Sequence, residues 1–403
     1  MTKEPLLQDA PAMSGKTIYQ EIKDFPVPQM ESSLLAELEE LRGCPIPFTD
    51  IHNISCTEIS SEVVRQLDPL VSVCMITYNH EKFIREAIDG VVNQETDFPF
   101  ELVIGEDCST DKTREIILEY QKKYPHLIRV LISEKNLTQN GSSNGKRTVL
   151  SCRGKYIAFC EGDDYWIDKK KLQKQVDLME NNKKLGMVTS NYQIYYEKTK
   201  QFGPEPIEDI AFKSPLYGLD AITQLVNKST IGTLTSLCRK DLICQCYIND
   251  PIFNRLFSLG DLTLWLGIIS KGGIFKLQEK TAIYRRHKEG ISSRFPFEIT
   301  RDAYVLRYYF WKNRLCQYYS NIEKKQLETY FLKKIFKNRK LNALMQHKDN
   351  LALIFELERK NNITSVFKYW CKRLALKCCI YRPLNHLNFF LNKVIRYIKR
   401  KPD

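Results

Sequence analysis

The segment YIAFCEGDDYWIDKKKLQKQ, Tyr156–Gln175, contains three features that decide the fold. An apolar run stops at the acidic turn Glu161–Asp164, two aromatic residues follow, and KLQKQVDLMENN comes next with helical spacing. A short continuous apolar run is typical of a strand buried on both faces. Acidic residues at the end of such a strand usually bind a ligand. The segment therefore predicts a buried strand, a binding turn and a helix.

The same alternation of strand and helix extends upstream of this segment. The predicted strands are VSVCMI (71–76), ELVIGE (101–106), IRVLIS (128–133) and KYIAFC (155–160), and the predicted helices are 83–92, 113–124 and 171–182, with a Gly-, Asn- and Ser-rich loop before the last strand. Strands alternating with helices predict right-handed βαβ units and a parallel sheet. Nucleotides bind such sheets at the carboxyl ends of strands, near the point where the strand order reverses.

Polar clusters follow three of the predicted strands. They are Thr77–His80, Glu106–Asp111 and Glu161–Asp164. Because the carboxyl ends of parallel strands share one edge, we expect the three clusters to meet there.

Composition and charge divide the chain into three parts. The 403 residues are 43% hydrophobic and 27% charged, which is typical of a globular protein. We predict an extension at 1–68 with one helix in ESSLLAELEELRG, a main domain at 69–300, and a basic, mainly helical region at 301–403. This last region holds 24 Lys and Arg against 7 Asp and Glu, a net charge of +17, whereas the first 300 residues hold 37 against 41.

Three features of the sequence indicate the cellular compartment of the protein. The 13 cysteines lack the paired spacing of a zinc site or a disulfide framework and indicate reduced thiols. No apolar run reaches the roughly 18 to 20 residues of a membrane span, and the first residues lack a signal-peptide pattern. We therefore expect a cytoplasmic protein.

Four motifs together resemble family 2 glycosyltransferases with the GT-A fold, of the bacterial surface-polysaccharide type. They are VSVCMITYN, LVIGEDCSTDKT, GKYIAFCEGDDYW and LGDLTLW, and the similarity covers roughly Pro69–Ser293. The resemblance implies an α/β fold with a Rossmann-like mixed sheet flanked by helices, here followed by a C-terminal helical extension. It also implies a nucleotide-sugar donor, a divalent cation (Mn²⁺ or Mg²⁺) and inversion at the anomeric carbon.

The resemblance assigns donor binding to the first two clusters. Asp107 matches the aspartate that accepts the N3–H of uracil, and Tyr78 matches the aromatic residue that stacks on the base. Thr77 and Asn79 belong to the same donor-binding turn. The alternative for Asp107 and its neighbours is capping of the helix that begins near Thr113.

The acidic turn matches the metal motif of the family. Asp164 is the expected metal ligand, and Asp163 is expected to contact the metal and the ribose or sugar. Glu161 stands where the family usually has Asp, which leaves open whether it contacts metal or sugar hydroxyls. The alternative is a solvated acidic turn.

Basic residues and a histidine elsewhere in the chain are expected to face the diphosphate. Arg286 and His287 lie in TAIYRRHKEGIS, where relatives fold over the pyrophosphate, and the resemblance makes His287 a candidate metal ligand. Lys146 is a further candidate for phosphate contact. For His287 and Lys146 the alternative is plain solvation.

Asp261 in SLGDLTLW matches the catalytic base of the family. Inversion requires a base that takes the proton of the acceptor hydroxyl as it attacks. The alternative is a helix cap, because LTLWLGIIS has a helical pattern and Asp is a good capping residue.

The C-terminal quarter mixes aromatic, aliphatic and basic residues. This pattern is typical of an interfacial helix on an anionic membrane and predicts peripheral attachment at its inner face. A helical subdomain packed on the main domain is the alternative, and no nucleic-acid motif is present.

The sequence thus predicts a metal-dependent inverting transferase that moves a sugar from a nucleotide donor, expected to be a UDP-sugar, to a saccharide or lipid-linked acceptor. The alternatives are a nucleotidyltransferase and a non-catalytic sugar-nucleotide-binding protein. The chain has no Gly-rich loop after the first strand, which a nucleotidyltransferase would need.

Overall fold

The computed structural model describes residues 16–48, 56–137, 142–203, 231–257 and 260–290, with parts of 215–225 and 293–332. The chain divides into two units, 1–339 and 340–403, and every described residue belongs to the first. Most of the basic region 301–403, with its predicted membrane contact, therefore lies outside the described residues. Among those described, no helix is both long and apolar enough to cross a bilayer. The proposed division at 68 and 300 stays a prediction.

A single mixed sheet organises the described part of the chain. Its strands are β1 (Thr57–Ile59), β2 (Val71–Thr77), β3 (Phe100–Glu106), β4 (Ile128–Ile132), β5 (Tyr156–Phe159), β6 (Tyr165–Trp166), β7 (Leu185–Tyr196), β8 (Gln201–Phe202), β9 (Leu237–Arg239) and β10 (Gly273–Arg286). The order is β1-β4-β3-β2-β5-β9-β7-β10-β6, with β8 paired to β7. Strands β4, β3, β2 and β5 are parallel, whereas β1, β9 and β6 pair antiparallel with their neighbours.

The strand order reverses at β2. The chain runs from β2 outward to β3 and β4 and then returns to place β5 on the other side of β2. A crevice at the carboxyl ends of strands is expected at such a reversal. The ends of β2 and β5 therefore mark the place where a ligand would bind.

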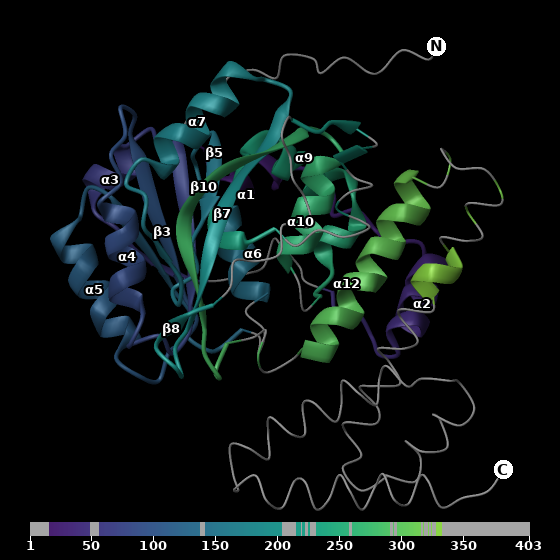
Figure 1. Cartoon of the computed structure of the whole chain (residues 1–403), viewed down its shortest axis with the longest axis horizontal. Helices are drawn as coiled ribbons and strands as arrows, with labels where there is room; N and C mark the ends of the chain where they lie inside the picture. Colours follow the sequence, from purple (N-terminus) through teal and green to yellow (C-terminus); the bar gives the residue numbers. More distant parts are fainter. Residues whose placement is uncertain are drawn as a thin grey trace, which may run out of the picture. The chain divides into compact units, whose positions relative to one another are not determined.

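Helices cover both faces of this sheet (Figure 1). They are α1 (Ile18–Ile22), α2 (Ser32–Arg42), α3 (Glu62–Gln66), α4 (Ile84–Val92), α5 (Thr113–Lys123), α6 (Ser142–Leu150), α7 (Lys171–Asn181), α9 (Lys240–Asn249), α10 (Gly260–Ile269) and α12 (Pro296–Phe310). One apolar core joins α4, α5 and α7 to the sheet, and a second joins α6, α9, α10 and α12 to it. Successive side chains of a strand point to opposite faces of the sheet. In β3, Leu102 and Ile104 therefore lie in the first core and Val103 lies in the second.

The strands and helices predicted from the sequence are confirmed, with one exception. The predicted Gly-, Asn- and Ser-rich loop is wrong over 142–150, which forms α6. Asn144 in this helix donates through Nδ2 to the backbone oxygen of Gly105, at 2.8 Å. A Cβ atom at Gly105 would lie 1.9 Å from Oγ1 of Thr148, so only glycine lets α6 approach β3 this closely.

The N-terminal extension packs against the main domain. Strand β1 extends the sheet beside β4, and helix α1 packs against α9. Helix α2 lies beside α12, from the far end of the described chain (Figure 1). A buried bidentate ion pair joins these two helices, with Nε and Nη2 of Arg42 each 3.0 Å from a carboxylate oxygen of Asp302.

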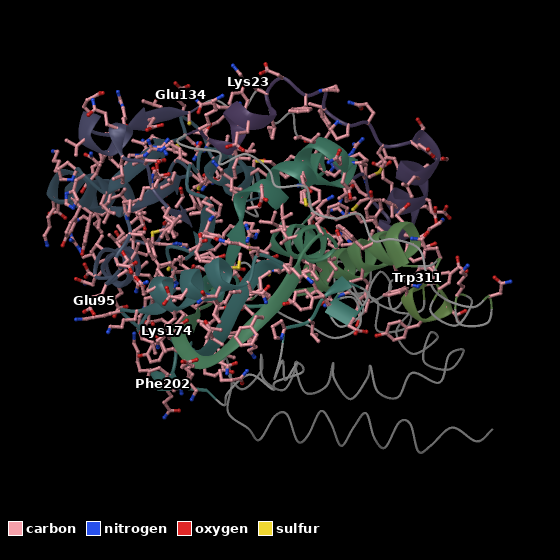
Figure 2. The ribbon with its side chains drawn as sticks, turned by 90° about the horizontal axis from the view of Figure 1, so that it is seen from above. Lys23, Glu95, Glu134, Lys174, Phe202 and Trp311 are labelled. Atoms are coloured by element: carbon pink, nitrogen blue, oxygen red, sulfur yellow. The ribbon has the colours of Figure 1, made fainter. Side chains whose placement is uncertain are left out.

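The short strand β8, which pairs with β7 outside the main strand order, carries an exposed aromatic residue. Phe202 in β8 is 55% exposed and lies at the rim of the molecule (Figure 2). Its ring contacts that of Tyr195 in β7, with the ring centroids 5.2 Å apart.

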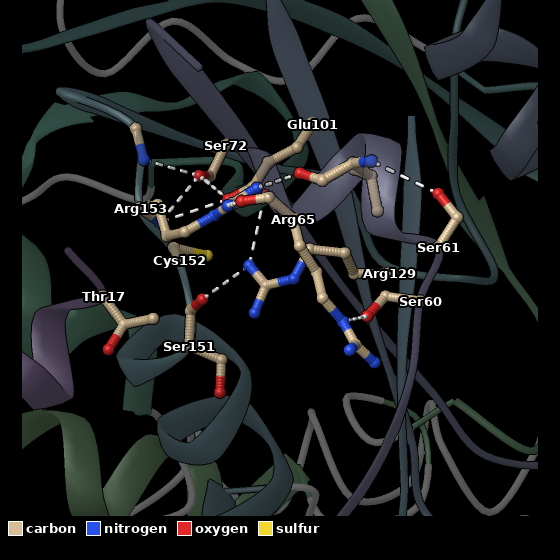
Figure 3. A network of polar contacts seen from close by, with 12 residues as sticks. Thr17, Ser60, Ser61, Arg65, Ser72, Glu101, Arg129, Ser151, Cys152 and Arg153 are labelled. Carbon is tan, nitrogen blue, oxygen red and sulfur yellow. Dashed lines mark hydrogen bonds and ion pairs between the residues drawn. The ribbon is translucent and has the colours of Figure 1, made fainter. Parts of the chain in front are cut away.

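A buried charge network ties the amino ends of the strands together (Figure 3). Glu101 at the start of β3 is fully buried and accepts from Arg129 at 3.1 Å, from Nε of Arg153 at 3.1 Å and from Ser72 at 2.6 Å. Arg129 also pairs with Glu58 of β1. The network lies at the end of β3 opposite to Asp107, so it supports the sheet without contacting the candidate site.

Glu101→Gln is expected to lower the free energy of unfolding by about 3 to 5 kcal/mol, because it leaves buried arginine charge without its carboxylate. Urea denaturation followed by circular dichroism measures this change. Glu119→Gln is the matched control, since Glu119 forms an exposed pair with Arg85 and should cost less than about 1 kcal/mol. Equal effects of the two substitutions would contradict the stabilising role of the network.

Candidate active site

The three polar strand ends meet in one cavity, together with the start of α10 and the end of β10. The cavity has a volume of about 520 Å³. Of the residues singled out from the sequence, Thr77, Tyr78, Asp107, Lys146, Glu161, Asp163, Asp164, Asp261, Arg286 and His287 line it. A volume between about 300 and 1,000 Å³ is typical of a small-molecule site.

The turn after β2 separates the roles of Tyr78 and Asn79. Tyr78 lines the cavity and is 38% exposed, so its ring is accessible. Asn79 adopts the left-handed conformation with φ 55° and is not among the lining residues. Its side-chain oxygen accepts from the backbone N–H of Thr110 at 2.8 Å. Asn79 thus joins the turn after β2 to the turn after β3, and the donor binding expected of it stays a prediction.

Asp107 after β3 is a buried carboxylate with protein donors around it. It is 1% exposed and accepts from the backbone N–H of Leu137 at 2.9 Å and from Nδ2 of Asn136 at 3.1 Å. Burial raises the pKa of Asp107 to about 6, against the lowering effect of the hydrogen bond from Leu137. Within the described part of the chain, the hydrogen bonds of its side chain come from this loop and from Ser133, and none comes from the helix α5 that it was alternatively expected to cap.

The acidic turn after β5 packs tightly against β2. A Cβ atom at Gly162 would lie 2.7 Å from Oγ1 of Thr77, and the N–H of Gly162 donates to the backbone oxygen of Ile76 at 2.9 Å. The glycine therefore allows the close approach of this turn to a neighbouring strand. This contact brings the carboxylates beside the end of β2.

Arg285 at the end of β10 holds the acidic turn in place. Its backbone N–H donates to Oδ1 of Asp164 at 2.8 Å, and its Nε donates to the backbone oxygen of Asp163 at 3.0 Å. The guanidinium also pairs with Glu86 and Glu197. Burial, then the charges of Asp163 and Glu161, raise the pKa of the Asp164 carboxyl well above its usual range.

Asp163 lies between two histidines. Its Oδ2 is 2.9 Å from Nε2 of His287 and 3.9 Å from Nε2 of His80. Burial opposes ionisation of Asp163, but the two imidazoles lower its pKa. Burial lowers the pKa of His80. Burial also opposes the charged form of His287, but the hydrogen bonds and charges of Asp163 and Glu289 together raise the pKa of His287. Such perturbed groups in one cavity are characteristic of a functional site.

Glu161, the first residue of the acidic turn, also lines the cavity. Its Oε2 is buried and has no hydrogen-bond partner in the described structure. Burial, then the charges of Asp163 and Asp261, raise its pKa to about 8. The Glu161 carboxyl group is therefore close enough to both Asp163 and Asp261 for their charges to act on it.

Asp261 lies in the first turn of α10 and faces the cavity. Its Oδ1 accepts from the backbone N–H of Leu262 at 2.7 Å, and its Oδ2 accepts from Oγ1 of Thr233 at 2.9 Å. Thr233 therefore fixes the carboxylate of Asp261 from outside α10. Burial raises the pKa of Asp261, which makes the ionised form a stronger base.

The two predicted phosphate contacts differ in their surroundings. Lys146 lies on α6, where its Nζ donates to the backbone oxygens of Phe253 and Arg255. Burial and the nearby Arg255 lower the pKa of Lys146 to about 7. Arg286 is exposed at the cavity wall. Arg286 thus remains accessible to an anion, whereas Lys146 anchors the segment 253–255.

Comparisons with known proteins identify the family of this chain. Residues 72–243 match the family model described as Glycosyl transferase family 2. The putative teichuronic acid biosynthesis glycosyltransferase TuaG of Bacillus subtilis is 30% identical over 267 residues, covering 64% of this chain and 98% of TuaG. The chain belongs to glycosyl transferase family 2.

Two further relatives show the range of this family. The Escherichia coli protein named UDP-Glc:alpha-D-GlcNAc-diphosphoundecaprenol beta-1,3-glucosyltransferase WfgD is 28% identical over 59% of this chain and 86% of its own length. An uncharacterized protein of Mycobacterium tuberculosis is 33% identical over 60% of this chain, and the match spans only 64% of that protein.

Solved structures confirm the fold class. S. aureus TarS 1-349, solved in complex with UDP-GlcNAc, has a TM-score of 0.52 at 22% identity, covering 70% of this chain and 76% of TarS 1-349. The predicted mixed α/β sheet flanked by helices, as in GT-A glycosyltransferases of this family, is therefore confirmed.

His80 and Thr233 contact residues of the site but were not selected from the sequence. His80 belongs to the polar cluster after β2, and its position at the end of a strand could have identified it as a candidate site residue. Thr233 lies in a short 3-10 helix, Thr233–Thr235, that no periodic pattern marks. Its contact with Asp261 depends on the tertiary fold.

Proposed function

We propose that this family 2 protein is an inverting glycosyltransferase. It moves a sugar from a nucleotide donor, a UDP-sugar, to the hydroxyl of a saccharide or lipid-linked acceptor in glycan synthesis. The observation that carries the proposal is the convergence of Asp107, Asp163 and Asp261 on one cavity of about 520 Å³ at the strand reversal. A base-binding acid, a metal-binding acid and a proton acceptor are the three groups that such a transfer needs.

Donor binding uses the β2 and β3 ends. Asp107 accepts the N3–H of uracil, and Tyr78 offers its accessible ring to the base. Arg286, exposed at the cavity wall, faces the diphosphate. Thr77 stays at the floor of the site, where its hydroxyl contacts Nδ1 of His80 at 3.2 Å.

The residues around Asp163 fit a divalent cation. A carboxylate with two imidazoles nearby offers oxygen and nitrogen donors of the kind that divalent metals bind, and Asp163 and His287 would hold it. Such a cation stabilises the charge that develops on the β-phosphate as the sugar leaves. The role predicted for Asp164 as a metal ligand stays a prediction, and its Oδ1 already accepts from Arg285.

Asp261 is the proton acceptor in this proposal. It lines the same cavity from a separate helix, α10, and in this proposal it takes the proton of an acceptor hydroxyl that attacks from the side away from the leaving group. The hydrogen bonds from Leu262 and Thr233 hold the carboxylate in one orientation. This orientation removes the entropic cost of positioning the base during the reaction.

The names of relatives support the acceptor class. WfgD is named for transfer from UDP-Glc to a sugar on diphosphoundecaprenol, and TuaG for teichuronic acid biosynthesis. A lipid-linked or polymeric saccharide is therefore the acceptor that we propose for this chain.

The reaction products test this function. The full-length protein is incubated with a panel of UDP-sugars and Mn²⁺, with saccharide and lipid-diphosphate acceptors, and the nucleotides are separated by anion exchange. A glycosyltransferase releases UDP, because the bond between sugar and β-phosphate breaks. Pyrophosphate-dependent formation of UTP and a sugar 1-phosphate would show a nucleotidyltransferase instead. Donor binding with no product under any acceptor condition would favour a binding protein.

The affinity for UDP is expected to depend on pH through Asp107. The pKa of Asp107 is about 6 in the folded protein, and only the carboxylate accepts the N3–H of uracil, so affinity should fall as pH decreases through 6. Calorimetry with UDP between about pH 5 and about pH 8 measures the effect. This range extends about one unit below and about two units above the pKa. Asp107→Ala should weaken UDP binding at every pH and abolish this component of the pH dependence. Unchanged affinity in that variant would contradict base recognition.

A further inference from the structure

Three side chains from separate segments direct one ligand atom each toward a common point. They are Nε2 of His80 after β2, Oδ2 of Asp163 after β5 and Nε2 of His287 after β10, and these atoms lie within 4.8 Å of one another. Two atoms that are each about 2.1 Å from one ion are separated by roughly 3 to 4 Å. The separation of 3.9 Å from the Asp163 oxygen falls in that range, and the separation of 2.9 Å lies just below it.

Both imidazoles are oriented by their other nitrogen. Nδ1 of His80 is 3.2 Å from Oγ1 of Thr77, and Nδ1 of His287 is 3.3 Å from Oε2 of Glu289. Metal-binding histidines are usually held in this way, with one ring nitrogen on a protein oxygen and the other on the metal. A histidine pair that only neutralised Asp163 would not require that both rings be fixed through Nδ1.

The surroundings of the cluster are apolar on one side and open on the other. The Phe83 ring packs against His287, with centroids 4.9 Å apart, and lies 6.4 Å from the His80 ring. The side chain of His287 is 4% exposed, whereas those of His80 and Asp163 are 17% and 20% exposed. The cluster is therefore sheltered but still accessible from the cavity, which leaves room for a substrate oxygen.

We propose that His80 is a third protein ligand, and that the site of His80, Asp163 and His287 selects a first-row transition-metal dication such as Mn²⁺ over Mg²⁺. Imidazole nitrogen suits transition metals, whereas Mg²⁺ prefers oxygen donors and retains several waters. An aspartate-only site formed by Asp163 and Asp164 would have no such preference. Only the biological role of this metal preference rests on the proposed function. The preference itself belongs to the protein without donor or acceptor.

Metal titration of the full-length protein, without donor or acceptor, tests the proposal. Free Mn²⁺ is measured by electron paramagnetic resonance, and Mg²⁺ is added as a competitor. His80→Gln is expected to weaken Mn²⁺ binding by at least about tenfold, with little change for Mg²⁺. The exposed His126 is the matched control, and His126→Gln should bind Mn²⁺ like the unmodified protein. An Mn²⁺ affinity of His80→Gln within twofold of the unmodified protein would overturn the proposal.

A second measurement needs no substitution and so does not depend on the folding of a variant. In the Co²⁺-loaded protein, two hyperfine-shifted imidazole N–H signals are expected in the proton NMR spectrum, one for each bound histidine. A single signal would show that His80 is not a ligand. Failure of the proposed function is distinguishable, because sugar transfer can be absent while both metal measurements succeed, and transfer can occur while His80 proves irrelevant to Mn²⁺.

Discussion

Asp261→Asn is expected to slow sugar transfer by about 10²- to 10⁴-fold and to leave the affinity for the donor unchanged. A general base acts only while the acceptor hydroxyl attacks, so its loss raises the energy of the transition state far more than that of the bound donor. Asn retains the shape of Asp, and its side-chain oxygen can still accept from Leu262 or Thr233, which lie 2.7 and 2.9 Å from the Asp261 carboxylate. Single-turnover transfer and calorimetry with the UDP-sugar measure the two quantities.

Asp241 provides a matched control for this variant. It lies in the first turn of α9, and its Oδ1 accepts from the next backbone N–H, of Leu242, at 2.9 Å, just as Asp261 accepts from Leu262. Asp241 does not line the cavity. Asp241→Asn should therefore transfer sugar at the normal rate. If Asp261→Asn does so too, Asp261 is only a helix-end residue, and Glu161 becomes the next candidate for the base.

The strands could be predicted because their signal is local. Continuous apolar runs such as Val71–Thr77 mark strands that are buried on both faces, and the parallel arrangement then places their carboxyl ends together. Helix α6 could not be predicted in this way. Ser, Asn and Gly are poor helix formers, and the segment is helical because Asn144 and Thr148 pack onto Gly105 of β3.

The directions of the side chains in the site could not be predicted from the sequence either. Spacing indicated which turns would meet, but it could not indicate where each side chain points. Asn79 turns to Thr110 and Lys146 to the oxygens of Phe253 and Arg255, because those backbone groups lie near them only in the folded chain. The partners of Arg285 are likewise 88 and 199 residues distant in sequence, at Glu197 and Glu86.

Asp163→Asn is expected to weaken Mn²⁺ binding by more than about 100-fold and to slow metal-dependent transfer by about 10³-fold, which corresponds to several kcal/mol of lost stabilisation of the leaving diphosphate. The reason is geometric, since the Asp163 oxygen is the one carboxylate oxygen toward which the Nε2 atoms of His80 and His287 both point in the described structure. Metal titration and transfer assays on the same preparation measure both effects, and an unchanged melting temperature shows that the fold is kept.

Asp164→Asn separates the two adjacent carboxylates. Asp164 is 3% exposed and accepts from the N–H of Arg285, a hydrogen bond that the Asn oxygen can also accept, so the turn should survive the substitution. If the metal is held mainly by Asp163 and the imidazoles, Asp164→Asn retains most of the Mn²⁺ affinity while Asp163→Asn loses it. The reverse result would assign the metal to Asp164, as the family resemblance implies. In that case Oδ1 of Asp164 can keep the hydrogen bond from the N–H of Arg285 while the other carboxylate oxygen binds the metal.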